Sequence, residues 1–275
     1  MRIDGLYAYT GGKAFDAAAA CVVLLHGAQH DHSVWILHSR YLAHHGYAVL
    51  ALDLPGHGRS SAPLPASVEA HAECIAGALA TLASPRFVLV GHSMGALVAL
   101  EVARRLASRV AGVALLGGAF PMKVSEALLS ATRDDPATAM QMINVWSHSA
   151  AIAPFAARPS NPGPGFSIVW QNLRLMERIA RVNGAEVLAA DFSACNSYRG
   201  GLEAARALRC PALFICGVAD QMTPPRAAAA LIDACADREV VSLPATGHAL
   251  MAENPEGVRQ ALQRFVQRCV AAGGA

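Results

Sequence analysis

Short apolar runs alternate along much of the chain with longer stretches in which apolar residues recur every three or four positions. Apolar runs of roughly four to eight residues are typical of buried strands, and the longer periodic stretches are typical of helices. Because strands that alternate with helices of this length form a parallel sheet covered on both faces, we predict an α/β fold. The predicted strands are residues 22–25, 47–54, 87–90, 110–116, 212–216 and 240–243. The predicted helices that connect or follow them are residues 33–45, 67–83, 96–107, 224–234 and 255–271.

The alternation stops after Gly117-Gly118 and resumes near residue 208. The segment between these points shows helical patterns and turns without a convincing strand, which indicates a helical cap over the strand ends. We therefore expect a first core part at 1–118, a cap at 119–207 and a second core part at 208–275. The cap helices are expected at residues 125–132, 136–148, 167–182 and 185–190, with a loop rich in proline and glycine at 158–165.

The pentapeptide Gly91-His92-Ser93-Met94-Gly95 falls where a predicted strand runs directly into a predicted helix. A serine on so sharp a turn is held in a strained backbone conformation, and the flanking glycines let strand and helix approach closely. The turn would lift the Ser93 hydroxyl above the sheet and leave the Met94 amide free at the helix N-terminus. A chance glycine-rich turn is the alternative, but the strand and helix around the motif favour a nucleophile elbow.

A serine hydroxyl needs a base to activate it and an acid to orient that base. Asp220 lies just beyond the strand predicted at 212–216, and His248 follows the strand predicted at 240–243. Both therefore fall at the edge of the sheet where Ser93 is expected, in the order serine, acid, histidine. Taken singly, Asp220 could be a turn residue or helix cap and His248 a loop histidine. Together they predict a catalytic triad.

The loop after the first long strand reads His26-Gly27-Ala28 and predicts the second backbone donor of an oxyanion hole. The amides of Ala28 and Met94 are the candidates for this role. Gln29 and His30 follow at once and could reach a substrate. A metal cluster of His26, His30 and His32 is a weak alternative, because only Asp31 is near enough to complete it.

Two further residues of these loops are expected to be structural. His26 is expected to fix its own loop through hydrogen bonds. Asp53 also follows a strand end, and the glycines after it make a tight turn, so we interpret it as an acid that fixes that loop rather than a catalytic group.

Composition limits the class of protein. The chain has 275 residues, of which 54% are hydrophobic and only 15% charged, and its formal net charge is +2. This balance gives no reason to expect nucleic acid or an anionic membrane as a partner. The expected partner is a small-molecule substrate. The seven cysteines form no C-x-x-C pair, so they predict buried thiols and a cytoplasmic, reducing location. No signal peptide or membrane-spanning segment is evident.

These residues resemble the α/β-hydrolase family over nearly the whole chain. The resemblance is carried by His26-Gly27, the run from Asp53 to Ser60, the elbow, Gly217-x-x-Asp220 and Gly247-His248. Glu253-Asn254-Pro255 is similar to the E-x-P that follows the histidine in many members. The resemblance implies a mostly parallel sheet of about eight strands flanked by helices, a helical cap, a Ser-His-Asp triad, and no metal or organic cofactor.

Three departures from particular members qualify the resemblance. The amino-terminal region is shorter than usual, because residues 3–10 supply one strand and the customary second strand has no clear place. Ser93 in place of an aspartate argues against a haloalkane dehalogenase or an epoxide hydrolase. The loop His26-Gly27-Ala28-Gln29 lacks the longer glycine run of many carbon–carbon bond hydrolases.

The function expected from these residues is hydrolysis of a small, largely apolar carboxylic ester or thioester through an acyl-enzyme. A carbon–carbon bond hydrolase, a lactonase, an acyltransferase or a cofactor-free perhydrolase could use the same triad. A small-molecule receptor that keeps the triad is an alternative of another class. Oligomeric state is left open. Six cap residues could line an apolar acyl pocket, and packing of the cap against the core accounts for each of them at least as well: Met140, Met142, Trp146, Phe155, Trp170 and Met176.

Overall fold

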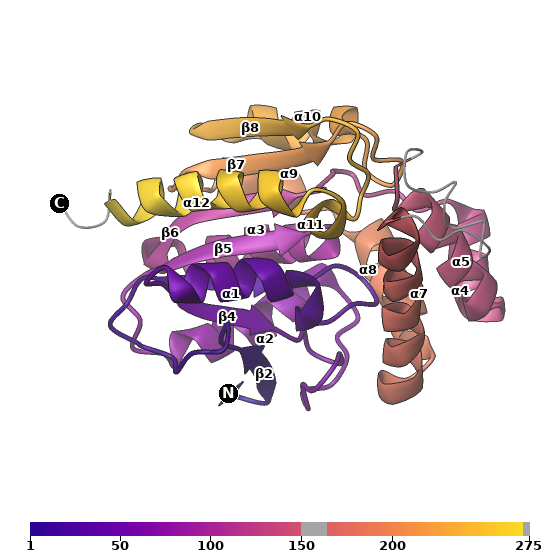
Figure 1. Ribbon diagram of the computed structural model, residues 1–275, viewed down its shortest axis with the longest axis horizontal. Helices are drawn as coiled ribbons and strands as arrows, with labels where there is room; N and C mark the ends of the chain where they lie inside the picture. The colour runs from indigo at the N-terminus through magenta and orange to yellow at the C-terminus, as the bar shows by residue number, and fades with distance from the viewer. Residues whose placement is uncertain (150–163, 272–275) are drawn as a thin grey trace.

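A computed structural model describes residues 1–149 and 164–271; Phe155 and most of the loop predicted at 158–165 lie outside these residues. The described chain is built on an eight-stranded sheet with the order β1-β2-β4-β3-β5-β6-β7-β8 (Figure 1). All neighbours from β4 to β8 pair in parallel, and β1 and β2 join as antiparallel strands. The strands are β1 (Arg2–Ile3), β2 (Leu6–Tyr9), β3 (Cys21–Leu25), β4 (Ala48–Leu52), β5 (Phe87–His92), β6 (Val110–Leu116), β7 (Ala212–Gly217) and β8 (Arg238–Leu243).

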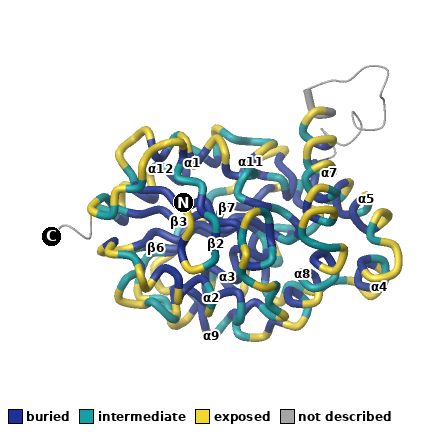
Figure 2. The backbone as a smooth tube through the Cα atoms, turned by 90° about the horizontal axis from the view of Figure 1, so that it is seen from below, coloured by how far each residue is buried: buried dark blue, intermediate teal, exposed yellow. Residues whose placement is uncertain are grey.

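The central strands are buried on both faces, which explains why they are continuous apolar runs rather than alternating ones. In β3, Val23 and Leu25 belong to the apolar core on one face of the sheet, whereas Val22 and Leu24 belong to the core on the other. In Figure 2 the strands accordingly lie in dark blue at the middle of the molecule. Two hydrophobic layers therefore hold the sheet, and its carboxyl-terminal edge is left to carry polar groups.

Helices cover both faces of the sheet, as the sequence predicts (Figure 1). One face packs against α1 (Ile36–His44) and α12 (Pro255–Ala271). The other packs against α2 (Val68–Ala80), α3 (Met94–Arg105), α9 (Gly201–Arg206) and α10 (Pro225–Ala234). The shorter helical segments are the 3-10 helices His32–Trp35 and Ala107–Arg109 and the one-turn helix α11 (Leu250–Glu253).

In the described part of the segment between β6 and β7, four helices lie together at one end of the sheet, and we call them the cap helices (Figure 1). They are α4 (Glu126–Asp134), α5 (Pro136–Trp146), α7 (Pro164–Asn183) and α8 (Glu186–Ser197). Leu128, Ile143, Met176 and Leu188, one from each helix, are buried in a separate apolar cluster. The cap helices thus pack around a core of their own beside the main sheet.

The expectation of a single amino-terminal strand is wrong. Residues 2–9 form two short antiparallel strands, with Ile3 paired with Leu6. Asp4 and Gly5 make the turn between them at φ angles of 47° and 80°. An Asp-Gly pair is a strong signal for a two-residue hairpin, because both positions take positive φ readily. The second strand was therefore present within the segment interpreted as one strand.

Two further observations bear on the environment of the protein. No helix in the described ranges is long and apolar enough to cross a lipid bilayer. All seven cysteines fall in the described part of the chain and are free thiols, five of them buried. Burial raises the pKa of all seven thiols, because it disfavours the charged thiolate, and for Cys74 the nearby Asp4 adds to this effect. The five buried thiols pack within the two apolar cores of the sheet.

Candidate active site

Ser93 occupies the sharp turn between β5 and α3. Its backbone angles are φ 54° and ψ −118°, outside the regions that residues with a side chain normally adopt. A Cβ added at Gly91 would lie 2.1 Å from the Gly95 carbonyl oxygen, and one added at Gly95 would lie 2.4 Å from the His26 carbonyl oxygen. The two glycines therefore permit the close packing that holds Ser93 in its strained turn, as the sequence predicts.

The structure brings Ser93, His248 and Asp220 together from three separate loops. The Ser93 hydroxyl lies 2.9 Å from His248 Nε2 and can donate its proton to that nitrogen. His248 Nδ1 lies 2.7 Å from Asp220 Oδ2 and donates to the carboxylate. This arrangement fixes the tautomer of His248, because its Nδ1 proton points to the acid and its Nε2 lone pair points to the serine.

Asp220 is held as an anion by several donors. The amides of Met222 and Thr223 both donate to Asp220 Oδ1 over 2.8 Å. Burial by itself raises the pKa of the Asp220 carboxyl, but His248 and these hydrogen bonds outweigh burial and hold the pKa at about 2. The acid therefore stays charged at neutral pH and can orient the imidazole of His248.

Thr223 is a site residue that the sequence reasoning missed. Its hydroxyl oxygen lies 2.9 Å from the Gly117 carbonyl oxygen, 2.8 Å from Asp220 Oδ2 and 3.0 Å from His248 Nδ1. A threonine three residues after an acid in a turn is a signal for such contacts, because short polar side chains bond local backbone there. The contact with His248 carries no local signal.

The loop that carries His248 is fixed by two neighbouring groups. Glu253 Oε2 accepts hydrogen bonds from the amides of Gly247 and Ser149, each over 3.1 Å. His92 Nε2 donates to the His248 carbonyl over 2.9 Å. A Cβ at Gly247 would lie 2.6 Å from the Ser149 amide nitrogen, so only glycine lets these segments meet. The Glu253 of the E-x-P motif thus acts on the histidine loop.

The loop after β3 lies against the elbow, where the sequence places the oxyanion donors. A Cβ added at Gly27 would lie 3.2 Å from Ser93 Cβ, so the glycine lets this loop pass close to the serine. Met94 is the first residue of α3, where helix amides have no acceptor within the helix. Ala28 follows Gly27 directly and is half-buried. The roles of the Ala28 and Met94 amides stay predictions at this point.

A cavity of about 340 Å³ opens beside His248. Residues from the loop after β3, the cap helix α7 and the His248 loop line it, and none of the described lining residues is Asp, Glu, Lys or Arg. Its apolar lining includes Val34, Ile36, Leu37, Ile168, Leu175 and Met251, and its histidines are His30, His92, His148 and His248. Burial lowers the pKa of His30, His92 and His148, so these three rings are neutral at pH 7.

Of the predicted pocket residues that the structure describes, only His30 lines this cavity. Its Nε2 donates to Asn172 Oδ1 of α7 over 2.9 Å. Gln29 is 1% exposed and instead donates its side-chain amide to the Met176 carbonyl. The structure places three of the cap candidates away from this cavity: Met140 lies in the apolar cluster of the cap, Trp146 packs against that cluster, and Trp170 is 49% exposed.

The other candidate cap residues lie as follows. Met176 is fully buried in the apolar cluster of the cap helices, and Met142 packs against that cluster. Phe155 lies outside the described residues. Among the described residues, the apolar lining therefore comes from α7 and from the loops and short helices of the core rather than from α5.

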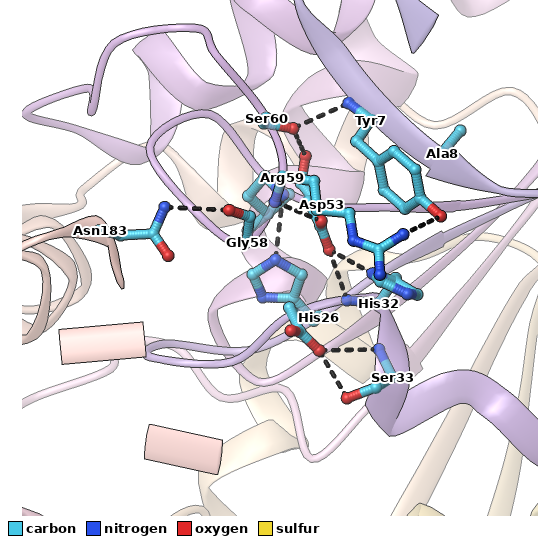
Figure 3. A network of polar contacts seen from close by, with 12 residues as sticks. Tyr7, Ala8, His26, His32, Ser33, Asp53, Gly58, Arg59, Ser60 and Asn183 are labelled. Carbon is cyan, nitrogen blue, oxygen red and sulfur yellow. Dashed lines mark hydrogen bonds and ion pairs between the residues drawn. The ribbon is translucent and has the colours of Figure 1, made fainter. Parts of the chain in front are cut away.

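His26 and Asp53 fix loops, as the sequence predicts (Figure 3). His26 Nδ1 donates to the Gly27 carbonyl over 2.8 Å, and His26 Nε2 accepts from the Leu54 amide over 3.0 Å. Asp53 Oδ1 accepts from His32 through both its amide and its Nδ1, and Asp53 Oδ2 accepts from the Arg59 amide. These bonds tie the loop after β3 to the loop after β4.

The described residues bring together one group with metal-ligand side chains, Asp31, His32 and Asp53. It differs from the three histidines considered above. Asp31 accepts from Ser33 on one oxygen and from Arg178 of α7 on the other, and both Asp53 oxygens are also bonded. The carboxylates are thus occupied by protein donors, so we assign the group to loop structure.

Comparison with known proteins places the chain in a family. A sequence profile of the alpha/beta hydrolase family matches residues 22–261, so the chain belongs to this family of enzymes. Among its relatives, the dihydrolipoyllysine-residue acetyltransferase component of the acetoin cleaving system of Pseudomonas putida is 28% identical over 257 residues. That alignment covers 90% of this chain and 63% of the relative, so the chain spans less than two thirds of that protein.

Two further proteins resemble the chain over most of their own length. The carbamate hydrolase RutD of Klebsiella pneumoniae, which is described as putative in its own name, is 27% identical over 84% of this chain and 85% of the relative. The structure of a thermophilic esterase from Thermogutta terrifontis superposes with a TM-score of 0.79, at 23% identity, over 96% of this chain and 93% of the esterase. The second likeness is one of fold.

Proposed function

We propose that the protein is a serine hydrolase that cleaves a small, largely apolar carboxylic ester or thioester through an acyl-enzyme. The observation that carries this proposal is the continuous contact from Ser93 Oγ to His248 Nε2 at 2.9 Å and from His248 Nδ1 to Asp220 at 2.7 Å. In the proposed triad Ser93 is the nucleophile, His248 the general base and Asp220 the acid that orients the base.

The proposed reaction has two halves. His248 takes the proton of Ser93 as the serine oxygen attacks the acyl carbonyl, and the Ala28 and Met94 amides bind the oxyanion that forms. Collapse of this intermediate expels the alcohol or thiol, which receives the proton from His248. Water then gives a proton to His248, attacks the acyl group and releases the acid from Ser93.

The cavity supports an uncharged substrate. A charged acyl group would lose its hydration on entry and would meet no opposite charge among the described lining residues. The volume of about 340 Å³ is at the lower end of the usual range for small-molecule sites, which is about 300–1,000 Å³. Short neutral esters and thioesters fit these conditions better than free dicarboxylic acids.

Other functions could use the same three side chains, Ser93, His248 and Asp220. The Klebsiella relative is named for carbamate hydrolysis and the Pseudomonas relative for acetyl transfer, so another acyl acceptor or a neighbouring bond type is a second candidate. Carbon–carbon bond hydrolysis, lactone hydrolysis and perhydrolysis would also use Ser93. A receptor would bind its ligand in the cavity, turn it over slowly and change its binding of a partner.

The test is steady-state hydrolysis of p-nitrophenyl esters of rising acyl length, with Ser93→Ala as the control. We expect turnover of short acyl chains that declines as the chain outgrows the cavity, and a loss of at least about a thousandfold in Ser93→Ala, because the nucleophile is gone. Ser93→Ala activity equal to that of the native protein would contradict the mechanism. Single turnover with ligand-dependent partner binding would favour the receptor.

We also propose that the protein works in a reducing, cytoplasmic compartment. Seven free cysteines support this location, because an oxidising compartment would favour their pairing. Neither the fold nor the charge balance gives a reason to propose a nucleic-acid partner.

A further inference from the structure

Asp191, on the cap helix α8, is a fully buried acid that bonds to the core rather than to its own helices. Its Oδ2 accepts from the backbone amide of Gln29 over 2.8 Å and from His57 Nε2 over 2.9 Å. Gln29 lies 162 residues away and His57 lies 134 residues away in the sequence. Burying a carboxylate costs free energy unless the group is paired and hydrogen-bonded, and here both of the partners that the structure describes belong to the core.

The hydrogen bonds around His57 indicate that its ring is doubly protonated. Nδ1 lies 3.0 Å from the Pro55 carbonyl oxygen, which only accepts, and Nε2 lies 2.9 Å from the Asp191 carboxylate. An imidazole that faces an acceptor on both sides satisfies them best as a cation. Burial lowers the pKa of His57, but the charge of Asp191 and these hydrogen bonds outweigh burial and raise it above its usual value.

The other titratable groups around His57 are compatible with a single buried cation. His26 faces it at a ring distance of 5.1 Å and is neutral, because its Nδ1 donates and its Nε2 accepts. His71 of α2 lies 6.2 Å from it, and burial lowers the pKa of His71 to about 4. Asp53, on the loop after β4, adds a second favourable negative charge.

Asp191 acts directly on the loop that approaches Ser93. Gln29 has a positive φ of 55°, so its backbone is held in a conformation that few side-chain residues adopt. The Gln29 amide donates to Asp191 of α8, and its side-chain nitrogen donates to the Met176 carbonyl of α7 over 3.1 Å. Two cap helices therefore hold the residue that follows Ala28.

We propose that Asp191 is a positioning residue that orients the Ala28 amide toward the oxyanion, and that the His57 ring, paired with Asp191 Oδ2, holds the carboxylate in its buried place. The inference rests on the proposed role of Ala28 as an oxyanion donor. Catalysis would then require the cap to be packed correctly on the core, because Asp191 belongs to the cap and the Ala28 amide belongs to the core.

The first test reads the His57 ring and the Ala28 amide by NMR in the resting protein, without any substrate. We expect both ring nitrogens of His57 to be protonated at pH 7 and the ring to lose a proton in Asp191→Asn. The Ala28 amide resonance should shift in the same variant. A neutral His57 in the native protein, or an unmoved Ala28 resonance in Asp191→Asn, would overturn the inference.

The second test separates kcat from KM with the best p-nitrophenyl ester. We expect Asp191→Asn to lower kcat by at least about tenfold and to change KM less than about twofold, because a misplaced oxyanion donor weakens the transition state and leaves ground-state binding nearly intact. The matched control is Asn183→Ala, which removes another cap-to-core hydrogen bond, from Asn183 to the Gly58 carbonyl over 3.2 Å. Its kcat and its Ala28 resonance should match those of the native protein.

These readouts separate the two proposals. Hydrolysis that survives Ser93→Ala would defeat the proposed function, whereas the NMR test would still report whether Asp191 holds His57 and Ala28. Native kcat in a folded Asp191→Asn, or an equal loss in Asn183→Ala, would show that the contact only anchors the cap and would overturn the inference. Circular dichroism of both variants verifies that they are folded.

Discussion

The Thr223 hydroxyl contacts the His248 imidazole and two groups beside it. It lies within 3.0 Å of the acid, of the imidazole and of the Gly117 carbonyl oxygen, and Thr223 is only 8% exposed. With one proton and two lone pairs, the hydroxyl can donate to the Gly117 carbonyl oxygen and turn a lone pair toward the Nδ1 proton of His248. At the scale of single residues, we therefore expect Thr223 to hold the side chains of His248 and Asp220 in their relative orientation.

Replacing this hydroxyl by a methyl group should reduce activity without unfolding the protein. In Thr223→Val the Gly117 carbonyl loses its donor and the His248–Asp220 pair loses a lateral restraint. A hydrogen bond of this kind contributes about 1 kcal/mol, so we expect a decrease in kcat of roughly five- to tenfold. Steady-state kinetics with a short p-nitrophenyl ester measures it.

The matched control is Thr132→Val in the cap helix α4. Thr132 is also buried and donates its hydroxyl to the Leu129 carbonyl over 2.7 Å, but its bond lies within its own helix. We expect this variant to lose a similar amount of stability and to keep its kcat. Equal kcat values for Thr223→Val and the native protein would assign Thr223 to stability alone.

The sequence located residues with local signals and missed those whose contacts are distant. The glycine spacing around Ser93 and the strand ends before Asp220 and His248 are readable along the chain, and the structure places the three side chains in contact. Asp191 looks like any acid on a helix, because its partner Gln29 is 162 residues away. Contacts of this kind depend on how the cap packs, which no local pattern encodes.

At the scale of elements, close approach explains where glycine is required and where it is not. Gly91 and Gly95 lie where β5, α3 and the loop after β3 converge, and a Cβ at either would meet backbone atoms at less than 2.5 Å. Gly77 in the interior of α2 is exposed and has no atom within 4 Å of the position of a Cβ. Gly91 and Gly95 are therefore required by the close packing around the turn at Ser93, whereas no packing contact requires a glycine at position 77.

Gly77→Ala should therefore stabilise the protein. Glycine in a helix interior costs about 0.5–1 kcal/mol relative to alanine, because the unfolded chain loses more freedom on folding. We expect the free energy of unfolding in urea to rise by roughly this amount, with unchanged ester hydrolysis. Gly91→Ala is the contrasting variant and should be strongly destabilised. A destabilised Gly77→Ala would contradict the account of α2.

Most elements of the core followed from periodicity, and the exceptions have physical reasons. The strand predicted at 110–116 and the helix predicted at 255–271 were correct to the residue. The helix α9 (Gly201–Arg206) and the one-turn α11 (Leu250–Glu253) were missed, because six and four residues are too few to establish a period. Arg238 and Glu239 extend β8, an edge strand whose outer positions tolerate charge.

At the scale of the whole molecule, the proposed site lies where the sheet edge meets the cap helices (Figure 1). Helix α7 contributes to the cavity through Ile168 and Leu175, while α8 reaches the loop beside the serine through Asp191. The core alone supplies Ser93, His248 and Asp220. The cavity lining and the hydrogen bonds that hold the loop after β3 come from both the core and the cap. Reactivity is thus expected to follow the core, and substrate choice to follow the cap.

Trapping the acyl-enzyme tests the central claim most directly. The protein is mixed with a short p-nitrophenyl ester, quenched in acid within the burst phase, digested and analysed by mass spectrometry. The proposal predicts one acyl group on the peptide that contains Ser93 and none in Ser93→Ala. Turnover with no acyl group on Ser93, or an acyl group on another residue that persists in Ser93→Ala, would contradict it.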